Sequence, residues 1–291
     1  MPEQQKIVIS ASRRTDIPCY YMEWFMDRVE QGSFEVVNPF SHVVSTVPAT
    51  PDLVAVIVFW SKNFAPFLFG DYGRRLIKKG FNLFFNFTIN SESPILEPHI
   101  PHLPERMKQM KMLCSAFHPD LISWRFDPIT FFQIDNGPLK NNLNDFERIA
   151  DTMASLGIRR CITSFMDDYP KIRKRMTKRT RFSFCYPSID TKVTIISRME
   201  QKLAERDISL YACCERKLLH ALPENSSIKP SSCIPNDRFV KLFKCSLSLN
   251  KDRGQRVQLG CGCKRSKDIG SYRLQPCYNG CLYCYANPAS M

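Results

Sequence analysis

The chain has 291 residues, of which 44% are hydrophobic and 12% aromatic, and its formal net charge is +13 at pH 7. These values are typical of a globular protein that can form a sizeable core. The longest apolar run, Leu53 to Trp60, falls well short of the roughly 20 residues that a membrane-spanning helix needs, so we expect no membrane partner. The positive charge favours anionic partners, with nucleic acid as the first candidate.

Cysteine is the most informative residue type in this chain. The residues before Ile7 are polar and lead straight into a strand-like segment, so we expect no signal peptide and a cytoplasmic protein. In a reducing cytosol, disulfides are uncommon, and an odd total of 13 cysteines also disfavours a fully paired framework. Nine of them lie between Cys213 and Cys284. Such clustering favours metal binding or redox chemistry over simple core packing.

The first 215 residues alternate short β-branched or aromatic segments with amphipathic stretches. We expect strands at Lys6–Ala11, Leu53–Trp60, Asn82–Ile89, Leu121–Phe126, Arg160–Phe165 and Ile208–Cys213, and helices at Tyr20–Gln31, Ala65–Lys79, Leu103–Phe117, Leu143–Leu156 and Lys192–Arg206. Gly32, Gly80 and Gly157 mark the ends of three of these helices. The alternation predicts an α/β fold with a parallel sheet, either a full or partial (β/α) barrel, which we favour, or a doubly wound sheet.

The remaining segments lack this alternation. Residues 33–50 are expected to form an irregular excursion, and the Pro- and Ser-containing residues 221–236 a loop. From residue 251 the sequence is rich in glycine and cysteine and has too little apolar surface to order itself alone, so metal ligation is a plausible source of its stability. We therefore divide the chain into a barrel domain, residues 1–250, and a cysteine-rich segment, residues 251–291, that packs on the barrel and closes it.

A cysteine triad lies in that segment, in the run Cys277-Tyr278-Asn279-Gly280-Cys281-Leu282-Tyr283-Cys284. With C-x3-C-x2-C spacing, three thiolates in one tight loop can bind three irons of a cubane cluster and leave the fourth iron without a protein ligand. Soft thiolates suit such clusters, and Gly280 lets the backbone turn tightly. The alternative is a zinc knuckle, although zinc sites usually show paired C-x2-C elements. We expect a [4Fe-4S] cluster at Cys277, Cys281 and Cys284.

This triad resembles the cluster motif of the radical S-adenosylmethionine superfamily, in which an aromatic residue commonly precedes the third cysteine, as Tyr283 does here. The resemblance implies a full or partial (β/α) barrel. It also implies that the open iron binds S-adenosylmethionine and that an electron donor drives cleavage of this cofactor to a 5′-deoxyadenosyl radical. In most of the superfamily the triad follows the first strand, whereas here it lies in the last 15 residues. The glycine-rich segment that holds the cofactor amino group in many members is absent.

A closer resemblance is to an uncharacterised bacterial family of radical-SAM-like proteins, a domain of unknown function whose cysteine cluster lies at the C-terminus. It covers nearly the whole chain. The resemblance rests on the segments Ser10 to Pro18, Val58 to Asn63, Trp124 to Pro128 and Gly260 to Asn287.

A second site is expected at Cys214, Cys233, Cys261 and Cys263, as either an auxiliary iron–sulfur cluster or a closed zinc site. Neighbours on a strand point to opposite faces, so only one of Cys213 and Cys214 should face inward. We choose Cys214 because the family resemblance places a cysteine before the glutamate there.

Charged residues follow several predicted strands. In a barrel, chemistry lies at the carboxyl ends of the strands, and these positions hold Arg13, Arg14, Asp16, Lys62, Arg125 and Asp127. The arginines could clamp the carboxylate of the cofactor, with Asp16 or Asp127 on its ribose hydroxyls. The alternative is that these acidic and basic groups pair with one another.

The leading interpretation is a radical-SAM-type enzyme with an unknown substrate, for which nucleic acid is a candidate. Residues 171–181 have seven basic side chains in 11 positions and could contact phosphates. A basic segment of this kind is, however, more often a surface helix exposed to solvent. The alternative class is a non-enzymatic iron–sulfur or zinc-binding module that binds an anionic partner.

Overall fold

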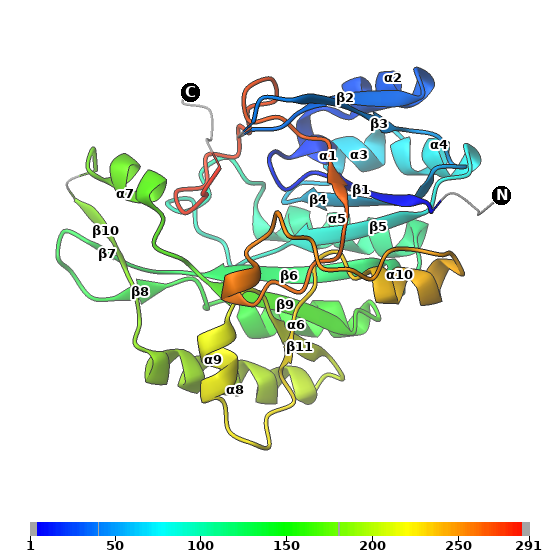
Figure 1. Ribbon diagram of the computed structural model, residues 1–291. Helices are drawn as coiled ribbons and strands as arrows, with labels where there is room; N and C mark the ends of the chain where they lie inside the picture. Colours follow the sequence, from blue (N-terminus) through cyan, green and yellow to red (C-terminus); the bar gives the residue numbers. More distant parts are fainter. Residues whose placement is uncertain (1–4, 40, 180, 287–291) are drawn as a thin grey trace.

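The computed structural model describes residues 5–39, 41–179 and 181–286, so Asn287 of the resemblance and Thr180 of the basic segment lie outside it. A sheet of eight parallel strands has the order β12-β11-β9-β6-β5-β4-β1-β13 (Figure 1). The strands are β1 (Ile7–Ala11), β4 (Val54–Ser61), β5 (Leu83–Thr88), β6 (Ile122–Ile129), β9 (Arg160–Phe165), β11 (Ser209–Ala212), β12 (Lys229–Pro230) and β13 (Lys267–Asp268). The α/β class and all six predicted strands are confirmed. The other two strands have two residues each, too few for a periodic signal.

Helices connect these strands, and the five predicted helices all have counterparts. The helices are α1 (Ile17–Tyr20), α2 (Met22–Glu30), α3 (Ala65–Phe69), α4 (Tyr72–Lys78), α5 (Leu103–Ala116), α6 (Phe146–Ser155), α7 (Pro170–Met176), α8 (Ile189–Ala204), α9 (Arg216–Ala221) and α10 (Asn236–Phe243), with 3-10 turns at Pro119–Leu121 and Val257–Leu259. No helix within the described ranges is long and apolar enough to cross a membrane.

Two predicted segments differ from the structure. The expected helix Ala65–Lys79 is divided into α3 and α4, because Gly70 and the left-handed Asp71, with φ of 52°, interrupt it. A Cβ at Gly70 would lie 2.3 Å from the Tyr72 ring. Residues 33–50, expected to be irregular, contain the antiparallel pair β2 (Ser33–Val37) and β3 (Val44–Pro48). A third sheet joins β7 (Phe131–Ile134), β8 (Lys140–Asn141) and β10 (Phe182–Cys185).

The six longer strands follow one another across the sheet in chain order. A doubly wound sheet reverses its strand order at a switch point, so this order excludes the doubly wound alternative. Closure into a full barrel is not observed, because in the described residues the edge strands β12 and β13 each pair with a single neighbour.

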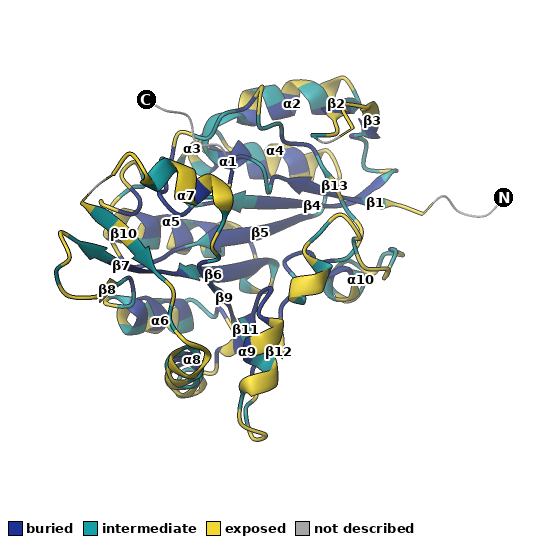
Figure 2. Cartoon of the chain, turned by 60° about the vertical axis from the view of Figure 1, so that its left-hand side comes forward, coloured by how far each residue is buried: buried dark blue, intermediate teal, exposed yellow. Residues whose placement is uncertain are grey.

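The two faces of the sheet are covered by different parts of the chain. Ile57 and Phe59 of β4 point to the crossover helices, whereas Val56 and Val58 point to the other face, where Phe239 of α10 and several cysteines pack. Strands buried on both faces have continuous apolar sequences, which explains the pattern of β4. Figure 2 shows these strands buried and the outer side of α8 exposed.

The cysteine-rich segment is hydrogen-bonded to both edges of the sheet. Its strand β13 pairs with β1. Farther upstream, Gly262 N donates to Ser231 O at 3.2 Å and Lys264 N to Ile234 O at 3.1 Å, just after β12. The described part of the cysteine-rich segment, residues 251–286, which we call the tail, therefore crosses the face of the sheet that the crossover helices do not cover.

Phe85→Ala is expected to lower the free energy of unfolding by about 3–5 kcal/mol, because it removes a fully buried aromatic side chain. Phe85 packs against four other phenylalanine rings, the nearest being Phe117 at 4.6 Å between centroids. Urea denaturation provides the measurement. The control is Phe69→Ala, at a 75% exposed position, with an expected change within about 0.5 kcal/mol. Equal destabilisation by both variants would contradict this description of the core.

Candidate functional site

A cavity of about 280 Å³ lies at the carboxyl ends of the strands. All 13 site residues predicted from the sequence line it: Arg13, Arg14, Asp16, Lys62, Arg125, Asp127, Cys214, Cys233, Cys261, Cys263, Cys277, Cys281 and Cys284. They come from β1, β4 and β6 or the turns that follow them, from the end of β11, from the loop after β12 and from the tail. The parallel sheet brings the strand ends together, and the tail folds back over them.

One partly buried carboxylate, that of Asp268, fixes the cysteine-rich segment to the end of β1. Asp268 accepts hydrogen bonds from Ser10 Oγ at 2.9 Å, Ser12 Oγ at 2.6 Å and the backbone N of Arg13 at 2.7 Å. Arg14 completes the contact, with Nε 3.8 Å from Asp268 and Nη1 donating to Gly270 O at 2.9 Å. The Arg14 side chain is therefore engaged in holding the tail. The role of Asp268 could not be predicted from the sequence, because more than 250 residues separate it from its hydrogen-bond partners.

Asp16 positions the cysteine triad. Asn279, between Cys277 and Cys281, donates from Nδ2 to Asp16 Oδ2 at 2.9 Å. The same oxygen accepts from the backbone N of Lys62 at 3.2 Å, and Oδ1 accepts from the backbone N of Cys19 at 3.1 Å. Both oxygens are thus engaged by the protein itself, which leaves Asp16 little capacity for the ribose role expected of it.

A second buried carboxylate, missed in the sequence, lies beneath the triad. Glu97 accepts from Lys62 Nζ at 2.8 Å and from the hydroxyl of Tyr283, and Arg106 lies 3.8 Å away. Burial alone would raise the pKa of Glu97, but Lys62 and Arg106 lower it below its ordinary value. Next to it, Leu96 O accepts from the backbone N of Leu282 at 2.9 Å. The triad loop is therefore held to residues 96–97 by both backbone and side chain.

Arg175 of α7 caps the end of the triad. Its guanidinium donates to Leu282 O at 2.9 Å, to Ala286 O at 3.2 Å and to Cys284 O. The basic segment was expected either to contact phosphates or to be a solvated helix. Its residues Lys174 and Lys178 are exposed, but Arg175 has a role inside the protein that composition did not reveal.

Arg125 and Asp127 form an ion pair at the end of β6. Arg125 Nη2 donates to Asp127 Oδ2, and Ser164 Oγ donates to Asp127 Oδ1. Burial alone would raise the pKa of Asp127, but Arg125 and Ser164 lower it. For this pair, the alternative that acidic and basic groups pair with one another is confirmed.

Arg13 and Trp60 keep polar atoms without partners. The guanidinium of Arg13 lies 5.5 Å from the centre of the Trp60 ring, and that of Arg125 lies 5.4 Å from it. Nη2 of Arg13 and Nε1 of Trp60 are buried yet make no hydrogen bond with any described residue. Buried polar atoms are normally hydrogen-bonded, so these donors are suited to a bound ligand. Trp60 immediately precedes Ser61 and Lys62 in a segment that the resemblance singled out.

The second group of cysteines includes one more member than expected. Cys213 Sγ lies 3.8 Å from Cys214 Sγ and 3.7 Å from Cys233 Sγ, and both Cys213 and Cys214 line the cavity. The expectation that only one of them faces inward is wrong. β11 ends at Ala212 and Cys214 has a left-handed φ of 59°, so strand alternation does not apply to this pair.

All 13 cysteines are free thiols. Burial raises the pKa of Cys277 to about 12 and also raises that of Cys281. Hydrogen bonds from Cys233 and Cys261 lower the pKa of Cys263. Within residues 5–39, 41–179 and 181–286, no group of three or more His, Cys, Asp or Glu side chains has an arrangement that could hold a metal ion.

A family model described as Domain of unknown function (DUF1848) matches residues 8–286. This match supports a family of unknown function and leaves the relationship to radical SAM proteins a prediction. No curated protein matches the sequence. One similar solved structure comes from work on inhibition of the pneumococcal virulence factor StrH and on N-glycan recognition and hydrolysis, with 11% identity and a TM-score of 0.26. The similarity covers 79% of this chain but only 59% of that one, and it carries no argument.

Arg175→Ala is expected to loosen residues 282–286, because three backbone carbonyls lose a charged donor. Charged hydrogen bonds contribute about 1.5–3 kcal/mol, so amide exchange there should accelerate roughly tenfold or more. Hydrogen–deuterium exchange with mass spectrometry measures this. Lys174→Ala removes an equal charge from an exposed position of the same helix and should leave the exchange unchanged. The same acceleration in both variants would assign the effect to charge alone.

Proposed function

Since the chain belongs to the family described as Domain of unknown function (DUF1848), whose description names no activity, we propose a function from the pocket itself: a radical-SAM-type iron–sulfur enzyme. The observation that carries the proposal is that the triad Cys277, Cys281 and Cys284 shares one cavity with the cationic strand ends. A triad remote from those strand ends would have left the mechanism without support.

The donor set suits a [4Fe-4S] cluster with one open iron. In a cubane each thiolate binds a different iron, so the three sulfurs need not converge on one point. Gly280 allows the tight turn between Cys277 and Cys281, because it has φ of 66° and a Cβ there would lie 2.7 Å from His99. When bound, such a cluster supplies the electron that cleaves S-adenosylmethionine.

For S-adenosylmethionine, Arg13 is the best carboxylate partner among the predicted residues. Its Nη2 is buried and has no partner in the described chain, whereas Lys62, Arg14 and Arg125 already pair with Glu97, Asp268 and Asp127. Charge-assisted hydrogen bonds to carboxylates are strong, especially away from water. The Trp60 ring beside Arg13 adds an apolar wall with one unused N–H donor.

Three further features belong to the proposed function. The sheet is a partial (β/α) barrel, supported by its single winding direction and by the tail that bridges its edges. The protein is cytoplasmic and uses a separate electron donor, in keeping with its free thiols. Its substrate is nucleic acid, supported by the net charge of +13 and by the exposed basic residues of α7.

The first test is cofactor turnover. After anaerobic reconstitution with iron and sulfide and reduction with dithionite, the wild-type protein should convert S-adenosylmethionine to 5′-deoxyadenosine. Cys281→Ala should abolish this product, because the cluster loses one of three ligands. The matched control Cys114→Ala removes a thiol of α5 that does not line the cavity, and it should keep full turnover. A wild-type cluster whose spectrum never changes with the cofactor would favour the alternative, a non-enzymatic iron–sulfur or zinc-binding module.

A second test concerns Arg13. Arg13→Ala should weaken S-adenosylmethionine binding about tenfold to a hundredfold, because one charged hydrogen bond contributes about 1.5–3 kcal/mol. Equilibrium dialysis of the reconstituted protein with labelled cofactor measures the affinity. Arg74→Ala, in which a 73% exposed arginine of α4 is removed, controls for net charge. Equal affinity in the two variants would remove Arg13 from the cofactor site.

A further inference from the structure

Nearly all of the net charge of the protein lies in two segments of the chain. Residues 171–181 hold seven basic and no acidic side chains, and residues 251–274 hold seven basic and two acidic ones. The rest of the chain is therefore close to neutral, although the whole has a net charge of +13. Charge that only keeps a protein soluble is spread over its surface, whereas a concentrated basic surface indicates an anionic partner.

These two segments meet where the cavity opens to solvent. Asp167, just before α7, and Arg256 of the tail both line the cavity, and Arg256 Nη1 donates to Asp167 Oδ2 at 2.7 Å. Their side chains are 41% exposed for Arg256 and 36% for Asp167, so this ion pair lies at the entrance. Farther along, Lys171 Nζ lies 5.6 Å from the centre of the Tyr272 ring. We call residues 171–179 and 251–274 together the basic rim.

Most of the positive charge of the basic rim is not neutralised by the protein. Arg173 pairs with Asp168 at 3.4 Å, as Arg256 does with Asp167. Other basic side chains of the rim are exposed and form no ion pair with any residue that the structure describes. These include Lys174, Lys178, Arg179, Arg253, Arg265 and Arg273. Phosphates that contact such cations release bound counterions, which favours association with a polyanion.

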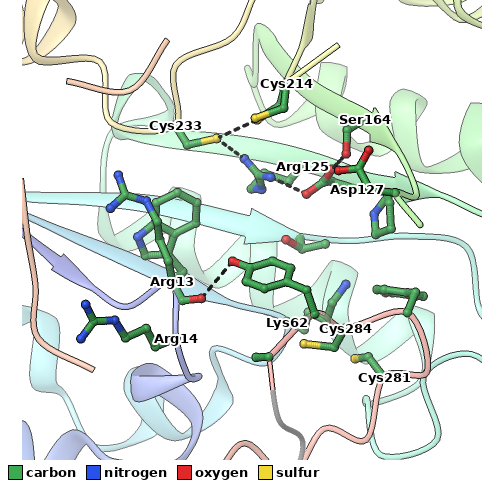
Figure 3. A pocket seen from close by; sticks show the side chains of 18 of the residues that line it. Arg13, Arg14, Lys62, Arg125, Asp127, Ser164, Cys214, Cys233, Cys281 and Cys284 are labelled. Carbon is green, nitrogen blue, oxygen red and sulfur yellow. Dashed lines mark hydrogen bonds and ion pairs between the residues drawn. The ribbon is translucent and has the colours of Figure 1, made fainter. Parts of the chain in front are cut away.

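The cavity beside the basic rim indicates which polyanion fits. Arg13, Arg14 and Arg125 are among the side chains that line it (Figure 3). Tyr285 also lines it and is 39% exposed, with its ring centre 5.5 Å from that of Tyr169. Bases stack on such aromatic rings, but a base within a duplex must first leave its own stack. An anionic membrane would meet the same charges without placing a group in the cavity.

We propose that the basic rim binds single-stranded nucleic acid, with the sugar–phosphate backbone along α7 and the tail and one unpaired base in the cavity. The inference rests on the proposed function, since it names the form of nucleic acid that this site takes as substrate. The observation that carries it is the concentration of charge beside the cavity, because charge that serves solubility alone has no reason to gather there.

Fluorescence anisotropy with a labelled oligothymidylate of about 20 nucleotides, titrated at several NaCl concentrations, tests this proposal. Two variants each remove three charges from one segment of the rim, Lys174→Ala/Lys178→Ala/Arg179→Ala and Arg253→Ala/Arg265→Ala/Arg273→Ala. The control Lys78→Ala/Lys108→Ala/Lys111→Ala removes three exposed charges from α4 and α5, which cover the other face of the sheet.

Each rim variant should bind the strand about tenfold or more weakly than the wild type. The slope of log affinity against log salt concentration should become shallower by about two in each, because a single strand releases roughly 0.7 counterions per phosphate contact. The control should bind as the wild type does. Equal weakening in the control would overturn the proposal, as would equal or tighter binding of the matching duplex. Binding to phosphatidylglycerol vesicles but not to the strand would do the same.

A measurement on the unchanged protein decides the question even if a rim variant fails to fold. When the strand is bound, acetylation of the wild type, read by mass spectrometry, should slow at Lys174 and Lys178. It should keep its rate at Lys108 and Lys111, which lie away from the rim. Protection of all four lysines, or of none, would contradict the proposed interface.

Turnover of S-adenosylmethionine without nucleic acid separates this inference from the proposed function. A wild type that forms 5′-deoxyadenosine but does not bind the strand would overturn the inference and leave the enzyme intact. A wild type that binds the strand through the basic rim but never forms this product would support the inference and overturn the proposed enzyme.

Discussion

Asp268 holds the two ends of the described chain together, and the pocket depends on that contact. Its carboxylate accepts hydrogen bonds from Ser10, Ser12 and the backbone of Arg13 and lies beside Arg14. An ion pair alone would leave oxygens of this partly buried carboxylate without hydrogen bonds, whereas three donors satisfy them. This bonding places β13 beside β1 and directs the residues that follow over the strand ends. The arginines and the cysteines therefore face one cavity because one carboxylate joins their segments.

Most of the fold follows from local patterns in the sequence. The six longer strands were predictable because strands buried on both faces have continuous apolar sequences, as in Val54–Ser61. Gly32, Gly80 and Gly157 adopt the positive φ that helix ends favour, so the helix boundaries there were also predictable. The edge strands β12 and β13 were not, because two residues give no period. Whether the sheet closes is decided by contacts between distant segments, which no local pattern records.

The candidate site was likewise predictable from the sequence only in part. Residue type and spacing, together with the family resemblance for Cys214, predicted 13 residues, and all of them line one cavity. What they could not supply is which groups are already paired: Asp16 and Arg14 hold the tail, whereas Arg13 keeps a free donor. Glu97 and Arg175 were missed because each acts through the backbone or a neighbour of the triad and not through a motif of its own. The expectation that only one of Cys213 and Cys214 faces inward failed because the strand ends at Ala212, before either cysteine, so strand alternation does not reach them.

The tail has a consequence for how the protein is made. Chains begin to fold while they are synthesised, N-terminal parts first. Here the wall of the cavity that carries the triad, and the strand that completes one edge of the sheet, come from residues 267–286. The cavity is therefore incomplete until this stretch has left the ribosome, and a prematurely terminated chain would have most of its sheet but no triad. The metal proposed for the triad would be loaded only after residues 277–284 have been synthesised, so a product truncated before them has no triad with which to compete for iron.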